Sequence, residues 1–81
     1  MDALPVCLQD GLAKIESRLE ARYKEVLTYV GTTNGGSMFR VYLGPETWSV
    51  IVVLPSNLAC LLAAGEGWED VGSLVKPGEE Y

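Results

Sequence analysis

The segment TWSVIVVL, residues 47–54, is apolar on both sides once it is extended as a β-strand. Successive side chains of a strand point to opposite sides of a sheet. One side of this strand carries Trp48, Val50, Val52 and Leu54. Ile51 and Val53 point to the other side. Because both sides are apolar, the segment is expected in a sheet that is covered on both faces.

Turn signals divide the chain around this strand. They are NGG at residues 34–36, GPE at 44–46 and PSN at 55–57, all compositions typical of tight turns. The intervening segments suit an antiparallel meander with strands at residues 25–33, 37–43, 47–54 and 58–64. The last of these segments, LACLLAA, has a helical composition, but its short length and its position favour a strand.

A helix is predicted before the first strand. Apolar residues spaced three or four apart follow one helix face at Leu8, Leu12, Ile15, Leu19, Tyr23, Val26 and Val30. Asp10 can accept hydrogen bonds from the free amides of a first turn, so the helix is expected to begin between residues 5 and 10 and to end near Tyr23. The predicted fold class is α+β, with one N-terminal helix followed by a four-stranded antiparallel β-meander. Residues 1–81 are expected to form a single small domain with an ordered core at about 6–72 and a frayed tail at 76–81.

One helix can cover only one face of this sheet. The second face, which we expect to include Ile51 and Val53, needs another cover, and a second copy of the chain is the most economical one. The alternative is that the C-terminal segment with Trp68 and Val71 folds back over that face. We therefore expect a homodimer with Ile51 and Val53 on its oligomer face.

The charge balance is acidic, with eleven acids, six bases and a net charge of −5. Nucleic-acid binding needs a basic surface, so nucleic acid is not an expected partner. The apolar runs are too short to span a bilayer, and a membrane is not expected either. Residues 1–5 lack the features of a signal peptide. A periplasmic or exported location is expected if a signal peptide precedes this sequence, and a cytoplasmic one otherwise.

The sequence contains no histidine, which removes the commonest general base and metal ligand. Cys7 and Cys60 are isolated from each other, so no metal site and no cofactor are predicted. Three states are open for these cysteines: two buried thiols, a disulfide, or a reactive Cys7 thiol at the helix N-terminus. A disulfide would close a loop of about 54 residues and requires an oxidising compartment.

Two groups of side chains are candidate binding surfaces, and no catalytic residue is assigned. Acids and aromatic residues give a candidate ligand or partner surface at Trp48, Glu66, Trp68, Glu69 and Asp70. A carboxylate pair in a cleft can do acid-base chemistry, although a chain reversal with solvated acids explains the same residues. Lys14, Arg18 and Arg22 align along the helix as a candidate anion-binding stripe, which a solvated helix face would also explain.

Several features occur together in the sequence. They are Cys7 opening the helix, Arg22-Tyr23 followed by Glu25, WSVIV at residues 48–52, Pro55 five residues before Cys60, and AAGEGW at residues 63–68. In this combination the chain resembles a set of short uncharacterised proteins from alphaproteobacteria. Such proteins typically carry an export signal and have no assigned activity. The resemblance therefore implies a disulfide and a periplasmic location, and it implies no function.

The sequence does not identify an activity. The absence of histidine, the two-sided strand and the acidic C-terminal part lead us to expect a non-enzymatic interaction or structural module that acts as a homodimer. The alternative is a small-molecule binding protein or a small hydrolase. It would use the acids of residues 65–70 beside Trp48 or Trp68.

Overall fold

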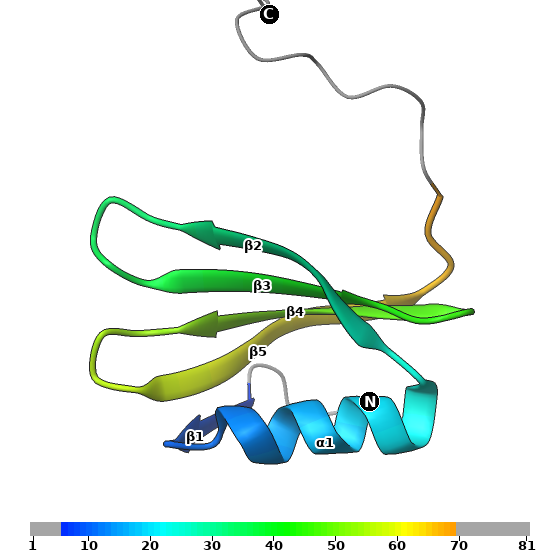
Figure 1. The fold of residues 1–81 in the computed structure, drawn as a ribbon, viewed down its shortest axis with the longest axis horizontal. Helices are drawn as coiled ribbons and strands as arrows, with labels where there is room; N and C mark the ends of the chain where they lie inside the picture. The colour runs from blue at the N-terminus through cyan, green and yellow to red at the C-terminus, as the bar shows by residue number, and fades with distance from the viewer. Residues whose placement is uncertain (1–5, 70–81) are drawn as a thin grey trace, which may run out of the picture.

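A computed structural model describes residues 6–69, which form one helix and one antiparallel sheet (Figure 1). The elements along the chain are β1 (Val6–Gln9), α1 (Leu12–Tyr23), β2 (Val26–Thr32), β3 (Met38–Leu43), β4 (Thr47–Val53) and β5 (Leu58–Glu66). Tight turns join the last four strands, and the backbone amides of Thr33, Gly44 and Leu54 donate hydrogen bonds across them. The predicted tail at 76–81 lies outside the described residues.

The sheet has five strands in the order β1-β5-β4-β3-β2, and all neighbouring strands are antiparallel. The predicted fold class, α+β with one N-terminal helix followed by a four-stranded meander, is therefore wrong, because the described chain is mostly β-strand and one strand precedes the helix. The missed strand, β1, precedes the helix and pairs with β5, so that Cys7 lies opposite Cys60. Cys7 is in an edge strand and not at the start of the helix. The partner of β1 is 53 residues further along the chain, which is why local sequence patterns do not indicate it.

The helix begins later than predicted, at Leu12. Gly11 occupies the N-cap without a side-chain hydrogen bond, and Asp10 lies in the preceding turn with a φ of 55°. The predicted Asp10 cap is therefore wrong. A Cβ atom at Gly11 would lie 2.4 Å from the Cβ of Leu8, which belongs to β1, so this junction requires glycine. Among residues 6–69, no helix is long and apolar enough to cross a bilayer.

The core lies between α1 and the sheet. Figure 1 shows α1 on one side of the sheet, running along the strands next to β1. Its Leu19 belongs to a buried cluster with Tyr42, Ile51, Val53 and Ala59. This cluster is bordered by the half-buried residues Leu12, Ile15, Met38 and Leu61. The helix therefore covers the side of the sheet that these residues share, which we refer to as the helix side.

Ile51 and Val53 belong to this core and not to an uncovered face. Ile51 is 0% exposed and Val53 is 9% exposed. The prediction that they form the oligomer face is therefore wrong, because the helix packs on their side of β4. The side of β4 that faces away from the helix carries Trp48, Val50 and Val52 instead.

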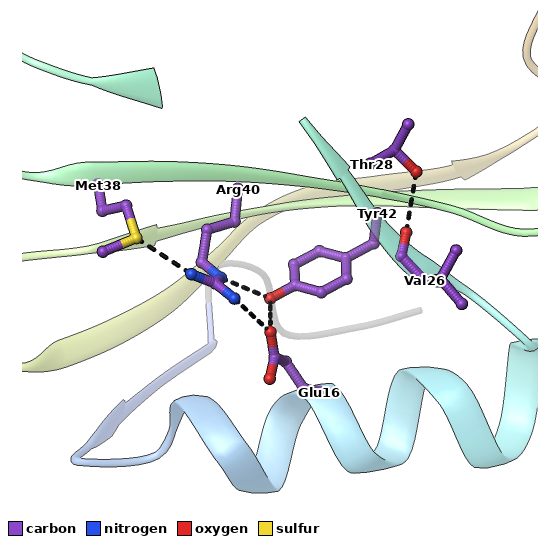
Figure 2. A network of polar contacts seen from close by, with 6 residues as sticks. All are labelled: Glu16, Val26, Thr28, Met38, Arg40 and Tyr42. Atoms are coloured by element: carbon purple, nitrogen blue, oxygen red, sulfur yellow. Dashed lines mark hydrogen bonds and ion pairs between the residues drawn. The ribbon is translucent and has the colours of Figure 1, made fainter. Parts of the chain in front are cut away.

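Two strands contain one extra residue each. The pairing of β2 with β3 shifts between Leu27 and Tyr29, which leaves Thr28 as the extra residue. The pairing of β5 with β4 shifts in the same way, and there Leu62 is the extra residue. In Figure 2 the hydroxyl of Thr28 donates to the carbonyl of Val26 at 3.0 Å, within the irregular part of β2. Such β-bulges change the side to which the following side chains point.

Candidate functional site

The side of the sheet that faces away from α1 is uncharged throughout the described strands. We refer to it as the open face. Its centre is formed by alternating residues of β3 and β4, namely Phe39, Val41, Leu43, Trp48, Val50 and Val52. Its margins are formed by β2 through Val26 and Tyr29, and by β1 and β5 through Cys7, Cys60 and Ala63. The result is an apolar surface that no described element covers.

Trp48 packs against the end of β5 on the open face. It lies opposite Gly65 in the strand register. A Cβ atom at Gly65 would lie 2.8 Å from Cζ2 of the indole, so a side chain there would displace the ring. Glycine therefore allows the indole to approach the backbone of β5 closely. The structure thus places one predicted ligand residue, Trp48, on an apolar surface.

Cys7 and Cys60 join β1 to β5 on the open face. Their Sγ atoms are 2.13 Å apart, which is a disulfide distance. Of the three states left open by the sequence, the structure has the crosslinked pair. The four-residue strand β1 is therefore held in the sheet by a covalent bond in addition to its backbone hydrogen bonds.

Of the remaining residues of the predicted ligand surface, Glu66 shares a cavity lining with Trp48, whereas Trp68 and Glu69 do not belong to that lining. Glu66 ends β5 on the helix side of the sheet. Trp68 donates its Nε1–H to the carbonyl of Gly44 at 2.8 Å and so attaches the chain to the turn between β3 and β4. Glu69 is exposed, and Asp70 lies outside the described residues. Glu66 and Glu69, the acids of this set within the described residues, are therefore both exposed and not buried as a carboxylate pair.

The predicted anion-binding residues Lys14, Arg18 and Arg22 are exposed on α1. Arg18 and Arg22 also border a groove of about 360 Å³ that is walled by aliphatic side chains such as Leu8 and Leu61. Lys14 is not among the residues that line this groove, so the groove does not bring the three basic residues together. Within residues 6–69, no three side chains of the metal-binding types are grouped so that they could hold a metal ion.

A polar network on the helix side connects α1 to β3 (Figure 2). Glu16 of the helix accepts hydrogen bonds from the Tyr42 hydroxyl and from Nη2 of Arg40, the latter at 2.6 Å. Nε of Arg40 donates to the Tyr42 oxygen at 2.8 Å, and Nη1 lies 3.1 Å from Sδ of Met38. Met38, Arg40 and Tyr42 alternate along β3 and share one side of it. One carboxylate on the helix can therefore meet two donors from the strand.

The network changes the titration of its members. Burial disfavours the charged form of Glu16, but hydrogen bonds from Tyr42 and Arg40 and the charge of Arg40 outweigh it, so the pKa of Glu16 lies below its ordinary value. Burial, together with the hydrogen bond to Glu16, raises the pKa of Tyr42 to about 12. Glu16 is therefore ionised and Tyr42 protonated over the whole neutral range.

Sequence reasoning missed the residues that the helix side brings together. Glu25, at the junction between α1 and β2, is 2% exposed although it is an acid. Its neighbour in the sequence, Lys24, ends the helix in a left-handed conformation, and no local pattern marks the burial of the glutamate that follows. The Arg40 and Tyr42 pair carried a usable signal, because a charged residue and a tyrosine two positions apart in a strand need a partner on one face.

The chain was compared with models of protein families, with curated proteins and with solved structures, and none of the three comparisons finds a match. The resemblance to short alphaproteobacterial proteins therefore stays a prediction, and so do the export signal and the location that it implies. Any functional conclusion must then come from the geometry of the open face and of the helix side.

Proposed function

We propose that the protein is a non-enzymatic interaction module that works as a homodimer paired through its open face. The observation that carries the proposal is the absence of charge from that face, within residues 6–69, in a chain whose net charge is −5. Two copies of an acidic chain repel each other over most of their surfaces. The open face lets them approach without burying a charge, which would be unfavourable.

Exposed apolar side chains on the open face support the same proposal. In a single copy, Phe39 is 39% exposed, Tyr29 is 56% exposed and Val26 is 57% exposed. Contiguous exposed apolar surface on a folded domain marks an interaction site. A twofold axis would use the same face on both copies, so each contact would remove apolar area from water twice.

The size of the open face is compatible with a dimer. Its five strands, about 4.8 Å apart and about six residues long at about 3.3 Å per residue, cover roughly 500 Å². Two copies would then bury roughly 1,000 Å², which is near the lower limit for a specific interface. Sheets packed face to face lie about 10 Å apart with their strands rotated by about 30°. The dimer would be a two-layer sandwich with one helix on each outer side.

The test is the mass of the whole chain in solution at micromolar concentration, measured by light scattering after size-exclusion chromatography. The expected mass is twice the chain mass of 8.8 kDa. A mass equal to one chain at that concentration would refute the homodimer.

A matched pair of variants tests the face. Val50→Glu places a charge at the centre of the open face and is expected to give a monomer with an unchanged circular dichroism spectrum. Val30→Glu is the control, because Val30 is 55% exposed and pairs with Arg40, so it points to the helix side. That variant should remain a dimer. A dimeric Val50→Glu protein, or a monomeric Val30→Glu protein, would show that the open face is not the interface.

A further inference from the structure

A cavity of about 370 Å³ lies on the helix side of the sheet, between the C-terminal half of α1 and the adjoining parts of β4 and β5. Its apolar walls are formed by Leu19, Tyr23, Leu61 and Ala64. The volume is within the range of small-molecule sites. At about 30 Å³ for each non-hydrogen atom, which is the share of a water molecule in the liquid, it holds roughly a dozen such atoms.

A buried carboxylate lines this cavity. The left-handed conformation of Lys24 ends α1 and turns the chain, so that the amide of Glu25 donates to the carbonyl of Leu19 at 3.2 Å. The Glu25 side chain is thereby held beside β4, where the Thr47 hydroxyl donates to its Oε2 at 2.5 Å. The other oxygen, Oε1, is buried and has no hydrogen-bond partner among the described residues.

An unpartnered buried carboxylate oxygen is unfavourable unless a donor reaches it. The residues that line the cavity do not supply a positively charged one. They include two carboxylates, Glu25 and Glu66, and neither a lysine nor an arginine. Negative charge in a lining that contains no cation favours a cationic ligand over an anionic one. The cavity therefore combines an apolar wall with a carboxylate oxygen that lacks a donor, and the negative charge of the lining favours a positively charged donor.

We infer that this cavity binds a small organic cation with an apolar body, of the arylalkylamine class. The ammonium group donates to the carboxylate of Glu25, and the ring lies against the side chains of Leu19, Leu61 and Ala64. Glu66, exposed at the end of β5, adds a second negative charge to the lining. The site is on the opposite side of the sheet from the open face, so it does not depend on the homodimer.

The experiment titrates the full chain with three probes of nearly equal shape, 2-phenylethylamine, 2-phenylethanol and 3-phenylpropanoate, by calorimetry and by amide chemical shifts. The amine should bind and shift the amides of Glu25, Ser49 and Ala64, while the alcohol and the acid should not. Failure of the amine to bind, or equal binding of the alcohol, would overturn the inference.

Glu25→Gln keeps the shape of the side chain, and its amide oxygen can still accept from Thr47. It should weaken amine binding by about tenfold or more, because a hydrogen bond to a charged group is lost. Glu20→Gln, on an exposed position of α1 away from the lining, makes the same change of charge and should bind as the unaltered chain does. Ala64→Leu fills the cavity and leaves Glu25 in place, so it should also abolish binding. Unchanged binding in Glu25→Gln or Ala64→Leu would contradict the site.

Discussion

The two sides of the sheet are built from different chemistry. On the helix side, Glu16 of α1 is bonded to Arg40 and Tyr42 of β3, and Glu25 is buried beside β4. On the open face, no side chain of the described strands is charged, and the central residues are aromatic or aliphatic. Hydrogen bonds require particular distances and directions, whereas apolar contacts do not. The hydrogen bonds of the helix side therefore determine the position of α1 on the sheet. The apolar contacts of the open face can contribute binding energy, but they do not by themselves select one partner.

The two sides of the sheet also contribute differently to the stability of a single copy. The buried cluster is small, and the polar network adds directional contacts that hold the helix over it. The open face contributes no such contacts within one copy. It retains apolar area that the proposed homodimer would remove from water.

The largest expected effect is on the open face and concerns the crosslink between Cys7 and Cys60. Reduction should lower the free energy of unfolding by about 4 kcal/mol in the chain-entropy model, since the bond closes a long loop. The measurement is guanidinium unfolding of the chain at one protein concentration, with and without dithiothreitol.

The control for the crosslink is the double variant Cys7→Ser with Cys60→Ser, whose unfolding should not respond to dithiothreitol. Mass spectrometry after alkylation without reductant should find no modified cysteine in protein from an oxidising compartment. Two modified cysteines in that material would contradict the bond.

A smaller effect on the unfolding free energy is expected at two adjacent residues of β4, Ile51 and Val50, which point to opposite sides of the sheet. Ile51→Ala should cost about 3 kcal/mol of unfolding free energy at any protein concentration, because Ile51 is 0% exposed in the core of each copy. Val50→Ala should destabilise the protein by an amount that depends on protein concentration, since Val50 is half-buried in one copy and would be covered further in the proposed dimer. Chemical unfolding at two concentrations measures both. A concentration-independent loss at Val50 equal to that at Ile51 would remove the distinction between the sides.

The smallest effect concerns the polar network. Tyr42→Phe removes the hydroxyl that donates to Glu16, and should lower the unfolding free energy by about 1 to 2 kcal/mol. Tyr29→Phe is the matched control on the open face, where Tyr29 is 56% exposed, and should leave the unfolding free energy unchanged. Equal losses in the two variants would show that the network contributes nothing specific.

The Tyr42 variant also predicts a dependence on pH. Because folding raises the pKa of Tyr42 from 10 to about 12, its contribution to stability is fully present below pH 10 and declines as the pH rises towards 12. The difference in unfolding free energy between the original chain and Tyr42→Phe should therefore shrink over that interval. A constant difference from pH 9 to 12 would contradict the raised pKa.

The sequence indicated the hairpins better than it indicated the whole sheet. Turn residues such as Asn34 and Gly35 act locally, so their composition alone predicts a chain reversal. Strand β1 has four residues and exists only because β5 lies beside it. Leu8 also happens to fit the spacing of the helical residues that follow it. Local periodicity therefore assigned β1 to the helix.

The choice between the two sides of β4 could not be read from β4 itself. Its alternation predicts two apolar sides but does not say which one the helix covers. That choice depends on β3, whose Arg40 and Tyr42 find Glu16 on α1. It also depends on which side of the sheet the apolar residues Leu12, Ile15 and Leu19 of the helix pack against. The prediction placed the oligomer face on the wrong side because these long-range contacts decide it.

The candidate cavity was hidden for a related reason. The sequence directed attention to the acids around Glu66 because they cluster beside tryptophan and glycine. Glu25 is the buried acid of the cavity lining. It precedes β2, whereas Glu66 lies at the end of β5, so the two acids are far apart in the sequence and come together only in the folded chain. Burial of a single acid is a property of the folded chain, and no residue type or spacing near Glu25 predicts it.

The bulges at Thr28 and Leu62 each insert one residue into a strand. Each insertion reverses, for the rest of that strand, which side chains point to the helix side and which to the open face. In a regular β5 that continued the phase of Leu61, Glu66 would emerge on the open face. In a regular β2 that continued the phase of Tyr29, Glu25 would do the same. Both carboxylates would then lie on the surface that has no charge. The two bulge residues thereby keep both carboxylates off the apolar face of the sheet. Neither bulge residue is charged, so neither is recognisable from the sequence as part of a site.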